Sequence, residues 1–368
     1  MTLAILGIGT ATPERQILQR DAAELAASFT TTEPGHDRAL AAIYRQTRIR
    51  SRGSVLLNDP GTAAWAQSFF PPASVDEPGG PTTRTRMERY ADDAGPLAIA
   101  AARRAVEAAG IDPAAITHLV TCSCTGFASP GFDLDLVAAL GLSVDVARTH
   151  VGFMGCHGAF NALRVADAFA AANPDNVPLV VCVELCSLHF QYGSTSDVIV
   201  ANSIFADGAA AVVGGHPART RSLSGPCWRL RHQWSRILPE SRDEMGWTIG
   251  DHGFEMSLSA AVPATIGRHL PAAVAAGLTA AGHRPEEIGA WAVHPGGPRV
   301  LVAAEESLGL PADALAVSRD VLAAHGNMSS ATILFILERL LTSEAAAPCL
   351  AMAFGPGLHA EFALIVRE

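Results

Sequence analysis

One cysteine stands where a chain can present a nucleophile. Cys156 lies between an apolar, strand-like run at 149–153 and an Ala/Leu-rich helical run at 159–171. Gly155 and Gly158 allow a sharp turn around the thiol and a close approach of a ligand to the backbone. Unpaired amide groups and the positive dipole end at a helix start favour a thiolate. A buried, inert cysteine is the ordinary alternative, and the glycines and the strand-to-helix position argue against it.

Two other stretches carry residues that assist a thiol. His294 ends an apolar, strand-like run at 289–294, and the Pro-Gly-Gly-Pro after it forces a tight turn. Asn327 lies in residues 324–331 (AHGNMSSA), just before a helical run. Residues at such strand ends face ligands in α/β sheets. Taken singly, the histidine is typical of a structural hydrogen-bonding group and the asparagine of a helix cap.

Together Cys156, His294 and Asn327 form a chemically coherent set. Acyl transfer uses a thiol nucleophile, an imidazole that activates it and a neutral amide donor. In a cysteine protease the asparagine orients the histidine. In a condensing enzyme both side chains donate to a developing oxyanion. The residue types alone do not choose between these two chemistries.

Length and composition limit the classes of protein. The 368 residues are 49% hydrophobic with a net charge of −10, which favours a large core in more than one unit and argues against a nucleic-acid partner. Seven cysteines, an odd number, predict a reducing, cytoplasmic setting and no disulfide framework. No metal site is expected, because the cysteine pairs lie in apolar strand-like runs. The first residues are typical of a strand and not of a signal peptide, and no apolar run reaches membrane-spanning length.

The elements that must position these residues alternate between strands and helices. Strands are predicted at 3–9, 116–122, 149–153, 178–184, 209–215, 289–294, 349–354 and 361–367. Helices are predicted at 20–29, 37–52, 84–109, 134–142, 159–171, 260–280 and 331–341. Apolar strands between helices favour an α/β fold with a parallel or mixed sheet. The pattern breaks between 217 and 251, so we expect two halves: residues 1–216 with Cys156, and residues 217–368 with His294 and Asn327.

Five motifs together resemble the type III polyketide synthases, the chalcone synthase-like family of thiolase-fold condensing enzymes. They are Gly155-Cys156, 205–211 (FADGAAA), 294–298 (HPGGP), 326–331 (GNMSSA) and 354–357 (FGPG). They stand in family order almost to the end of the chain, and the strand–helix order before them fits. The last two separate this family from the ketoacyl-synthase III branch. The chain resembles a bacterial-type member.

The resemblance implies a fold and a reaction. The fold is a homodimeric, internally duplicated αβαβα thiolase-like fold with mixed five-stranded sheets. In the reaction Cys156 takes an acyl group from acyl-CoA, and malonyl-CoA loses CO2 to give an enolate that His294 and Asn327 stabilise. The enolate then attacks the Cys156 thioester. CoA thioesters are thus substrates with no permanently bound cofactor, and a thiolate–imidazolium pair is expected at the site.

The resemblance also assigns a substrate pocket. Phe205 matches the gatekeeper between the CoA tunnel and the cavity. The motif at 326–331 adds Ser329 to the pocket. The motif at 354–357, which matches the loop that shapes the pocket floor, adds Phe354, Gly355, Pro356 and Gly357. Several positions depart from the plant members of the family. Met256 replaces a second gatekeeper Phe, Trp247 replaces a glycine that lines the cavity, and Ser129 replaces a Met that reaches the partner subunit. Threonines of the plant members are replaced by Cys124, Cys186 and His189.

From these departures we expect a cavity that is displaced and not enlarged. It would suit an aliphatic starter and few extensions, giving an alkylpyrone or alkylresorcinol.

The CoA phosphates need donors, and several alternatives to the synthase stay open. Candidates for CoA binding are Arg38, Arg45, Arg48, Gly296, Gly297 and Arg299. A solvated basic helix face explains the first three arginines equally well. The alternatives in function are a ketoacyl-synthase III-like enzyme that makes one condensation, a cysteine hydrolase, and a non-catalytic acyl-CoA-binding relative.

Overall fold

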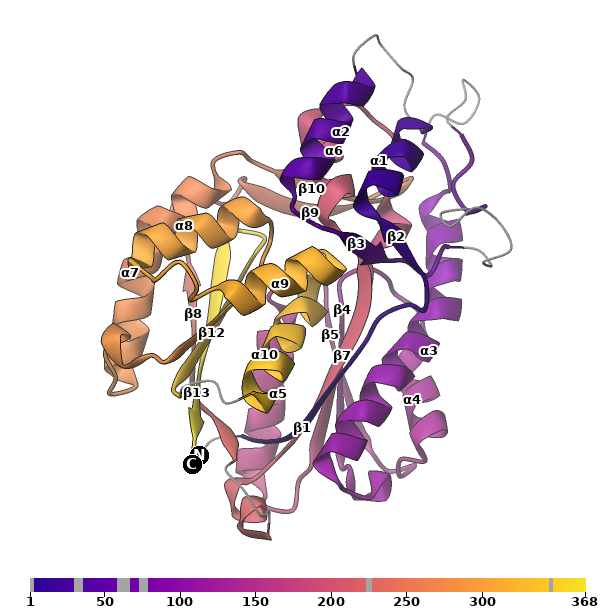
Figure 1. The fold of residues 1–368 in the computed structure, drawn as a ribbon. Coiled ribbons are helices and arrows are strands. Elements are labelled where there is room, and N and C mark those ends of the chain that lie inside the picture. The colour runs from indigo at the N-terminus through magenta and orange to yellow at the C-terminus, as the bar shows by residue number, and fades with distance from the viewer. Residues whose placement is uncertain (1–2, 30–35, 58–66, 73–78, 223–226, 344–346) are drawn as a thin grey trace.

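The chain folds into layers of helices and strands around one large sheet (Figure 1). The computed structural model describes residues 3–29, 36–57, 67–72, 79–222, 227–343 and 347–368. In these residues a mixed sheet of nine strands has the order β11-β12-β13-β8-β1-β7-β6-β4-β5. No helix in the described part of the chain is long and apolar enough to cross a membrane.

The sheet has two sets of strands that meet edge to edge. The first set is β1 (Ala4–Ala11), β4 (His118–Ser123), β5 (Ala147–Gly152), β6 (Pro178–Leu185) and β7 (Asp207–Gly215). The second set is β8 (Trp228–Ile237), β11 (Ala290–Val293), β12 (Cys349–Gly355) and β13 (His359–Arg367). Antiparallel pairing of Ala4 with Arg229 and of Ile5 with Trp228 joins β1 to β8. The expectation of five strands holds for the first set, and it is corrected for the second, which has four in the described residues and continues the same sheet.

Helices cover the outer faces and fill the space between the two sets of strands (Figure 1). The central layer consists of α5 (Gly158–Ala172) and α10 (Thr332–Thr342). One outer layer consists of α3 (Thr83–Ala109) and α4 (Phe132–Leu140). The other consists of α7 (Val262–Ala280) and α8 (Pro298–Leu308). Phe160 of α5 and Leu334 of α10 share one buried cluster with Val180 of β6 and Ala351 of β12. This order of layers is the αβαβα arrangement.

Short elements gather at one end of the sheet, at the top of Figure 1. They are α1 (Gln19–Ala27), α2 (His36–Gln46), α6 (Ser196–Ile204) and the strand pairs β2 (Gln16–Leu18) with β3 (Ser51–Gly53) and β9 (Met245–Gly250) with β10 (Gly253–Leu258). Ala22, Leu40, Tyr44 and Ile199 form a small core between α1, α2 and α6. Helix α9 (Ala316–His325) leads back toward them.

Two predictions of elements are wrong. The helix expected at 37–52 ends at Gln46, because Arg48 takes a φ of 59° and the chain then enters β3. The interval 217–251, where the strand–helix pattern breaks and no strand or helix is predicted, contains β8 and β9. Exposed arginines in β8 hide that strand from a search for apolar runs. The boundary at 216 and 217 falls at the short helical turn η3 (Pro217–Ser222) and stays a prediction.

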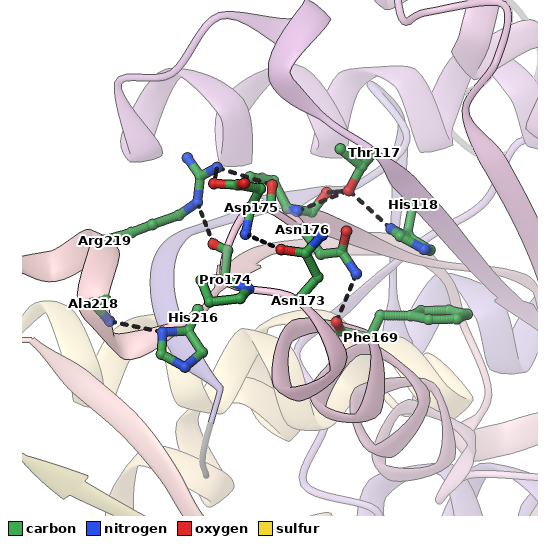
Figure 2. Close-up of polar contacts among 11 residues, drawn as sticks. Thr117, His118, Phe169, Asn173, Pro174, Asp175, Asn176, His216, Ala218 and Arg219 are labelled. Carbon is green, nitrogen blue, oxygen red and sulfur yellow. Dashed lines mark hydrogen bonds and ion pairs between the residues drawn. The ribbon is translucent and has the colours of Figure 1, made fainter.

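Bonds from side chains to the backbone hold the turn that follows β7 (Figure 2). In η3, Arg219 donates from Nε to the carbonyl of Pro174 at 3.1 Å and from Nη2 to that of Asp175 at 2.9 Å. Nearby, Nδ2 of Asn176 donates to the carbonyl of Phe169 at 2.8 Å. These bonds fix the carboxyl end of α5, whose other end begins next to Cys156.

Candidate active site

Cys156 lies in the turn between β5 and α5, as the sequence predicts, and His157 is the N-cap residue of the helix. Gly155 before it has a φ of +84°. A Cβ built on Gly155 would lie 2.4 Å from Cδ of Pro356. The turn therefore needs glycine both for its backbone angle and for the space that Pro356 occupies.

Asn327 is fixed by bonds of its backbone and of its side chain. Its N–H donates to the carbonyl of Ile204 at 2.8 Å, and its own carbonyl accepts from the N–H of Ala206 at 2.9 Å. Its Oδ1 accepts the N–H of Ser329 at 2.9 Å, so Nδ2 is left directed at Sγ of Cys156, 4.0 Å away. The amide is thereby oriented as a donor toward the sulfur.

His294 is buried directly after β11, and its backbone N–H donates to the carbonyl of Met352 at 2.9 Å. Neither of its ring nitrogens has a hydrogen-bond partner within the described residues, so it bonds to neither Cys156 nor Asn327. A buried polar group without a partner costs about 1–3 kcal/mol, and such a group in a native structure calls for a functional explanation. The ring of His294 keeps a donor and an acceptor for a bound molecule.

Burial dominates the electrostatics of these residues. It raises the pKa of the Cys156 thiol to about 12, although hydrogen bonds with Ser329 and Asn327 lower it. It lowers the pKa of His294 to about 3, and His157 adds to the lowering. The expectation of a standing thiolate is thus corrected, because desolvation outweighs the helix start and favours the neutral thiol and imidazole at neutral pH.

Cys156 lines a mostly apolar cavity of about 140 Å³. Eight of the eleven expected pocket residues also line it: Cys124, Cys186, His189, Phe205, Trp247, Met256, Ser329 and Pro356. Phe354, Gly355 and Gly357 do not line it, and their role in the pocket stays a prediction. The side chain of Phe354 packs in the core beneath α7 and α8, and a Cβ on Gly355 would lie 2.4 Å from the ring of His157. Gly357 has a φ of +111° and turns the chain toward β13.

Trp247 and His189, which both line the cavity, belong to a fixed aromatic wall. His189 donates from Nε2 to the carbonyl of Thr125 at 2.6 Å and accepts the N–H of Phe254 on Nδ1 at 2.9 Å. Burial lowers the pKa of His189 to about 3, so the ring is neutral with its proton on Nε2. It stacks on the ring of Phe254, with centroids 4.2 Å apart. Trp247 meets it edge-on and donates to the carbonyl of Cys124 at 2.8 Å.

Sequence reasoning missed two charged residues beside the cavity. Arg52 lines it and donates from Nη1 to the carbonyls of Asn202 at 2.8 Å and Phe205 at 2.6 Å, which holds the backbone of the gatekeeper position. Glu184 is fully buried and accepts the N–H of Cys124 at 3.0 Å, which holds the loop after β4. A lone charge in the apolar run of β6 was a usable signal for Glu184. Arg52 is one of several arginines in its stretch, and nothing in the sequence distinguishes it.

The candidates for CoA binding lie at the surface. Arg38, Arg45 and Arg48 are exposed on α2 or just after it, and Arg299 is exposed in the first turn of α8. Gly296 and Gly297 are half-buried in the turn after His294. Among the described residues none of the four guanidinium groups forms a hydrogen bond or an ion pair with a protein group, so their donors are available to solvent or to an anion.

The chain is similar to known proteins over nearly its whole length. The model of the chalcone and stilbene synthase N-terminal domain matches residues 2–217, and that of the C-terminal domain matches residues 229–368. The alpha-pyrone synthesis polyketide synthase-like Pks18 of Mycobacterium tuberculosis is 34% identical over 365 residues, which cover 98% of this chain and 90% of that protein. The 1,3,6,8-tetrahydroxynaphthalene synthase of Streptomyces peucetius is 33% identical, covering 98% and 92%.

Solved structures agree with these matches. PKS-I from the brown alga Ectocarpus siliculosus superposes with a TM-score of 0.90 at 30% identity, covering 100% of this chain and 98% of that one. The C-terminal type III polyketide synthase domain of Steely1 from Dictyostelium gives a TM-score of 0.89 at 29% identity, covering 100% and 99%. The chain therefore belongs to the chalcone and stilbene synthase family, the type III polyketide synthases, which are malonyl-CoA-dependent condensing acyltransferases.

Proposed function

We propose that this polyketide synthase loads an aliphatic acyl group onto Cys156, extends it with a few malonyl-CoA units and releases an alkylpyrone or alkylresorcinol. The observation that carries the proposal is the cavity at Cys156, which is mostly apolar and is lined by the large side chains of Trp247 and His189. Their bulk leaves less room for an aromatic starter with several extensions than small side chains would leave. The name of the mycobacterial relative, an alpha-pyrone synthesis protein, supports the same product class.

In the loading step, the sulfur of Cys156 attacks the thioester carbonyl of the acyl-CoA. The thiol proton passes to a ring nitrogen of His294, because neither nitrogen is engaged by the described protein groups. As the bond from the carbonyl carbon to the CoA sulfur breaks, that proton goes to the leaving thiolate. The products are an acyl thioester on Cys156 and free CoA. Nδ2 of Asn327 is oriented to donate to charge that develops beside the sulfur.

In the extension step, malonyl-CoA loses its carboxylate as CO2, and the electron pair of that carbon–carbon bond forms an enolate. His294 and Asn327 donate to the enolate oxygen, where charge develops in a site that excludes water. The enolate carbon attacks the acyl carbonyl on Cys156, a carbon–carbon bond forms, and the sulfur of Cys156 leaves and takes up a proton. Each extension thus consumes one proton and releases one CO2.

Phosphate binding is proposed for the exposed arginines. Arg38, Arg45, Arg48 and Arg299 are our candidates to bind the CoA phosphates, and the backbone of Gly296 and Gly297 would adjoin the pantetheine arm. Their exposure and lack of protein partners support this role. Arginine forks match phosphate oxygens in geometry and charge.

A homodimer in the cytoplasm is also proposed. β5 is the outer strand of the sheet, and Phe127 and Val144 near it are 45% and 92% exposed. A strand edge that no other described strand pairs with, beside exposed apolar side chains, suits a second copy of the chain. All seven cysteines are free and buried, which supports a reducing compartment.

One assay tests the proposed reaction against its alternatives. The protein is incubated with malonyl-CoA and a panel of aliphatic and aromatic starter CoAs, and the products are identified by mass. Alkylpyrones or alkylresorcinols are expected. Turnover of aromatic starters alone, or of malonyl-CoA alone, would contradict the aliphatic starter. A single condensation would favour a ketoacyl-synthase III-like enzyme. Release of free acid without a new carbon–carbon bond would favour a hydrolase. Unchanged turnover by Cys156→Ala would overturn the mechanism.

A further inference from the structure

The carboxyl end of α6 is held by groups from distant segments of the chain. The last carbonyl groups of a helix have no partner within it. Here the carbonyl of Ser203 accepts from Nε2 of Gln19 at 2.7 Å, and that of Ile204 accepts the N–H of Asn327 at 2.8 Å. The bonds from Arg52 described above hold the same turn. Because this turn leads directly into the gatekeeper position, whatever moves it also moves that position and Asn327.

Gln19 joins this turn to the end of α2. It is buried, and its Nε2 also lies 2.9 Å from Oγ1 of Thr47 and 3.4 Å from the carbonyl oxygen of Tyr44. An amide nitrogen carries two protons, so one can bond to Ser203 while the other bonds to the end of α2. Thr47 is fixed in turn, since its hydroxyl donates to the carbonyl of Tyr44 at 2.7 Å. One side chain thus links the last turns of two helices.

The segment that Gln19 holds also carries two of the exposed arginines. Thr47 is buried, whereas Arg45 and Arg48 on either side of it are exposed. Arg48 has a φ of 59°, which is uncommon for a residue with a long side chain. An anion bound by these two guanidinium groups would therefore rest on the segment whose inner side is bonded to Gln19.

Two further contacts join the same segment to the catalytic side of the molecule. Ile49 shares a small apolar cluster with Ile204, and Phe205 packs against this cluster. The N–H of the residue after Ile49 donates to the carbonyl of Ala323 at 2.7 Å, in the last turn of α9. That helix leads to Asn327. The end of α2 is therefore in direct contact with both segments that place the reacting groups.

We propose that Gln19 is a positioning residue for condensation, which couples binding of the CoA phosphates at the end of α2 to the positions of Phe205 and Asn327. The inference rests on the proposed function, which assigns the phosphates to a set of arginines that includes Arg45 and Arg48. Binding energy from a remote part of a substrate can orient groups at the reacting centre. A substrate that lacks the phosphates should then react slowly even when it saturates the site.

The test compares malonyl-CoA with malonyl-pantetheine, which has the same reacting end and no phosphate. Single-turnover extension of a preloaded acyl-enzyme gives the maximal rate and the half-saturating concentration for each substrate. In the wild type we expect malonyl-CoA to have the lower half-saturating concentration and a maximal rate roughly tenfold higher. Gln19→Met keeps the length of the side chain and removes its N–H donors. The two maximal rates should then agree within about twofold, while malonyl-CoA keeps its lower half-saturating concentration.

A second variant guards against a folding defect in the first. Thr47→Val cuts the link at its other end, because it removes the hydroxyl that bonds to Gln19 and keeps a similar shape. It should also bring the two maximal rates together. Gln16→Met is the matched control, since it makes the same substitution at an exposed glutamine of β2. It should keep the ratio of rates of the wild type.

The outcomes separate this inference from the proposals on which it rests. Equal maximal rates in the wild type, with half-saturating concentrations that differ, would mean that the phosphates bind without coupling, and would overturn the inference alone. A difference in maximal rate that persists in both Gln19→Met and Thr47→Val would overturn it as well. Equal values of both parameters in the wild type would overturn the phosphate site too. No extension with either substrate would overturn the proposed function.

Discussion

Trp247 donates its indole N–H to the carbonyl oxygen of Cys124 at 2.8 Å, which joins β9 to the loop after β4. The ring of His189 abuts the indole, with centroids 5.5 Å apart, and both nitrogens of His189 are hydrogen-bonded. Rotation of one side chain therefore does not move this wall, because its neighbours would lose their bonds. We expect the wall to limit the number of extensions.

Replacing Trp247 by glycine should lengthen the polyketide part of the product. The change removes the indole from the cavity lining, so the intermediate gains room for at least one more malonyl unit before it cyclises. Loading of the starter should stay within a few-fold of wild type, since Cys156 is untouched. The masses of the products made from one starter measure the effect.

Trp247→Phe is the matched control for that prediction. It keeps a six-membered ring in the wall, removes the N–H that binds the carbonyl of Cys124, and frees much less volume than glycine does. Products of wild-type length from Trp247→Phe would assign the effect to volume. Longer products from both variants would assign it to the lost hydrogen bond, and no change in either would show that another surface limits extension.

Replacing Asn327 by aspartate should slow condensation far more than loading. The oxygen that accepts the N–H of Ser329 is retained, but the group directed at Cys156 becomes an acceptor with negative charge. A lost donor to a developing oxyanion typically costs about 10²–10³ in rate, and the added charge opposes the enolate further. Single-turnover extension of a preloaded acyl-enzyme gives the condensation rate, and intact mass gives the loading rate.

Asn327→Ala separates the two contributions. It removes the donor without adding a charge, so its condensation rate should fall between those of wild type and Asn327→Asp. Comparable rates for all three proteins would mean that Asn327 does not donate to the reacting atoms.

The sequence predicts elements well where the signal is local. Helix α3 is predicted at 84–109 and spans Thr83–Ala109, because Gly110 ends it with a φ of 61°. Cys156 is placed correctly for the same kind of reason, since glycines mark its turn. Strand β8 is missed because it contains exposed arginines and does not read as an apolar run. It is a strand because it pairs with β1 and β13 in the folded sheet.

The geometry of the candidate site depends on packing between distant segments. Trp247 and Cys124 are 123 residues apart, and no local pattern announces their bond. The pKa of Cys156 also departs from expectation, because the degree of burial is a property of the folded whole. The lining of the cavity is a third case, since α1, α6, β9, β10 and the segment after β3 all contribute to it.

Replacing His189 by glutamine should make the fold less sensitive to acid. Burial lowers the pKa of His189 from 6.5 to about 3, so between these values the unfolded chain binds a proton that the folded chain does not. The contribution of neutral His189 to the free energy of unfolding is therefore complete above pH 6.5 and is lost as the pH falls toward 3. The loss is about 1.4 kcal/mol per pH unit, or about 2 kcal/mol between pH 7.5 and pH 5.

Glutamine can keep both hydrogen bonds of the ring, with Nε2 donating to Thr125 and Oε1 accepting from Phe254, but it does not titrate. Denaturant unfolding at pH 7.5 and pH 5 should show the wild type losing about 2 kcal/mol more than His189→Gln. Equal losses in the two proteins would mean that His189 binds a proton as readily in the folded state as in the unfolded one.

Gly155→Ala should reduce both stability and loading, and Gly110→Ala is its matched control. Both glycines have a positive φ, +84° and +61°, so alanine at either site costs about 1–3 kcal/mol of backbone strain. They differ in space: a Cβ at Gly155 would lie 2.4 Å from Cδ of Pro356, whereas one at Gly110 meets nothing within 4 Å. We expect Gly155→Ala to displace Cys156 as well, and a misplacement of about 1 Å can cost roughly 100-fold in rate. Thermal melting measures the loss of stability, and the rate of acyl-enzyme formation measures the displacement of Cys156. Gly110→Ala should lose stability but load at the wild-type rate. A Gly155→Ala protein that also loads at the wild-type rate would show that the turn tolerates a side chain.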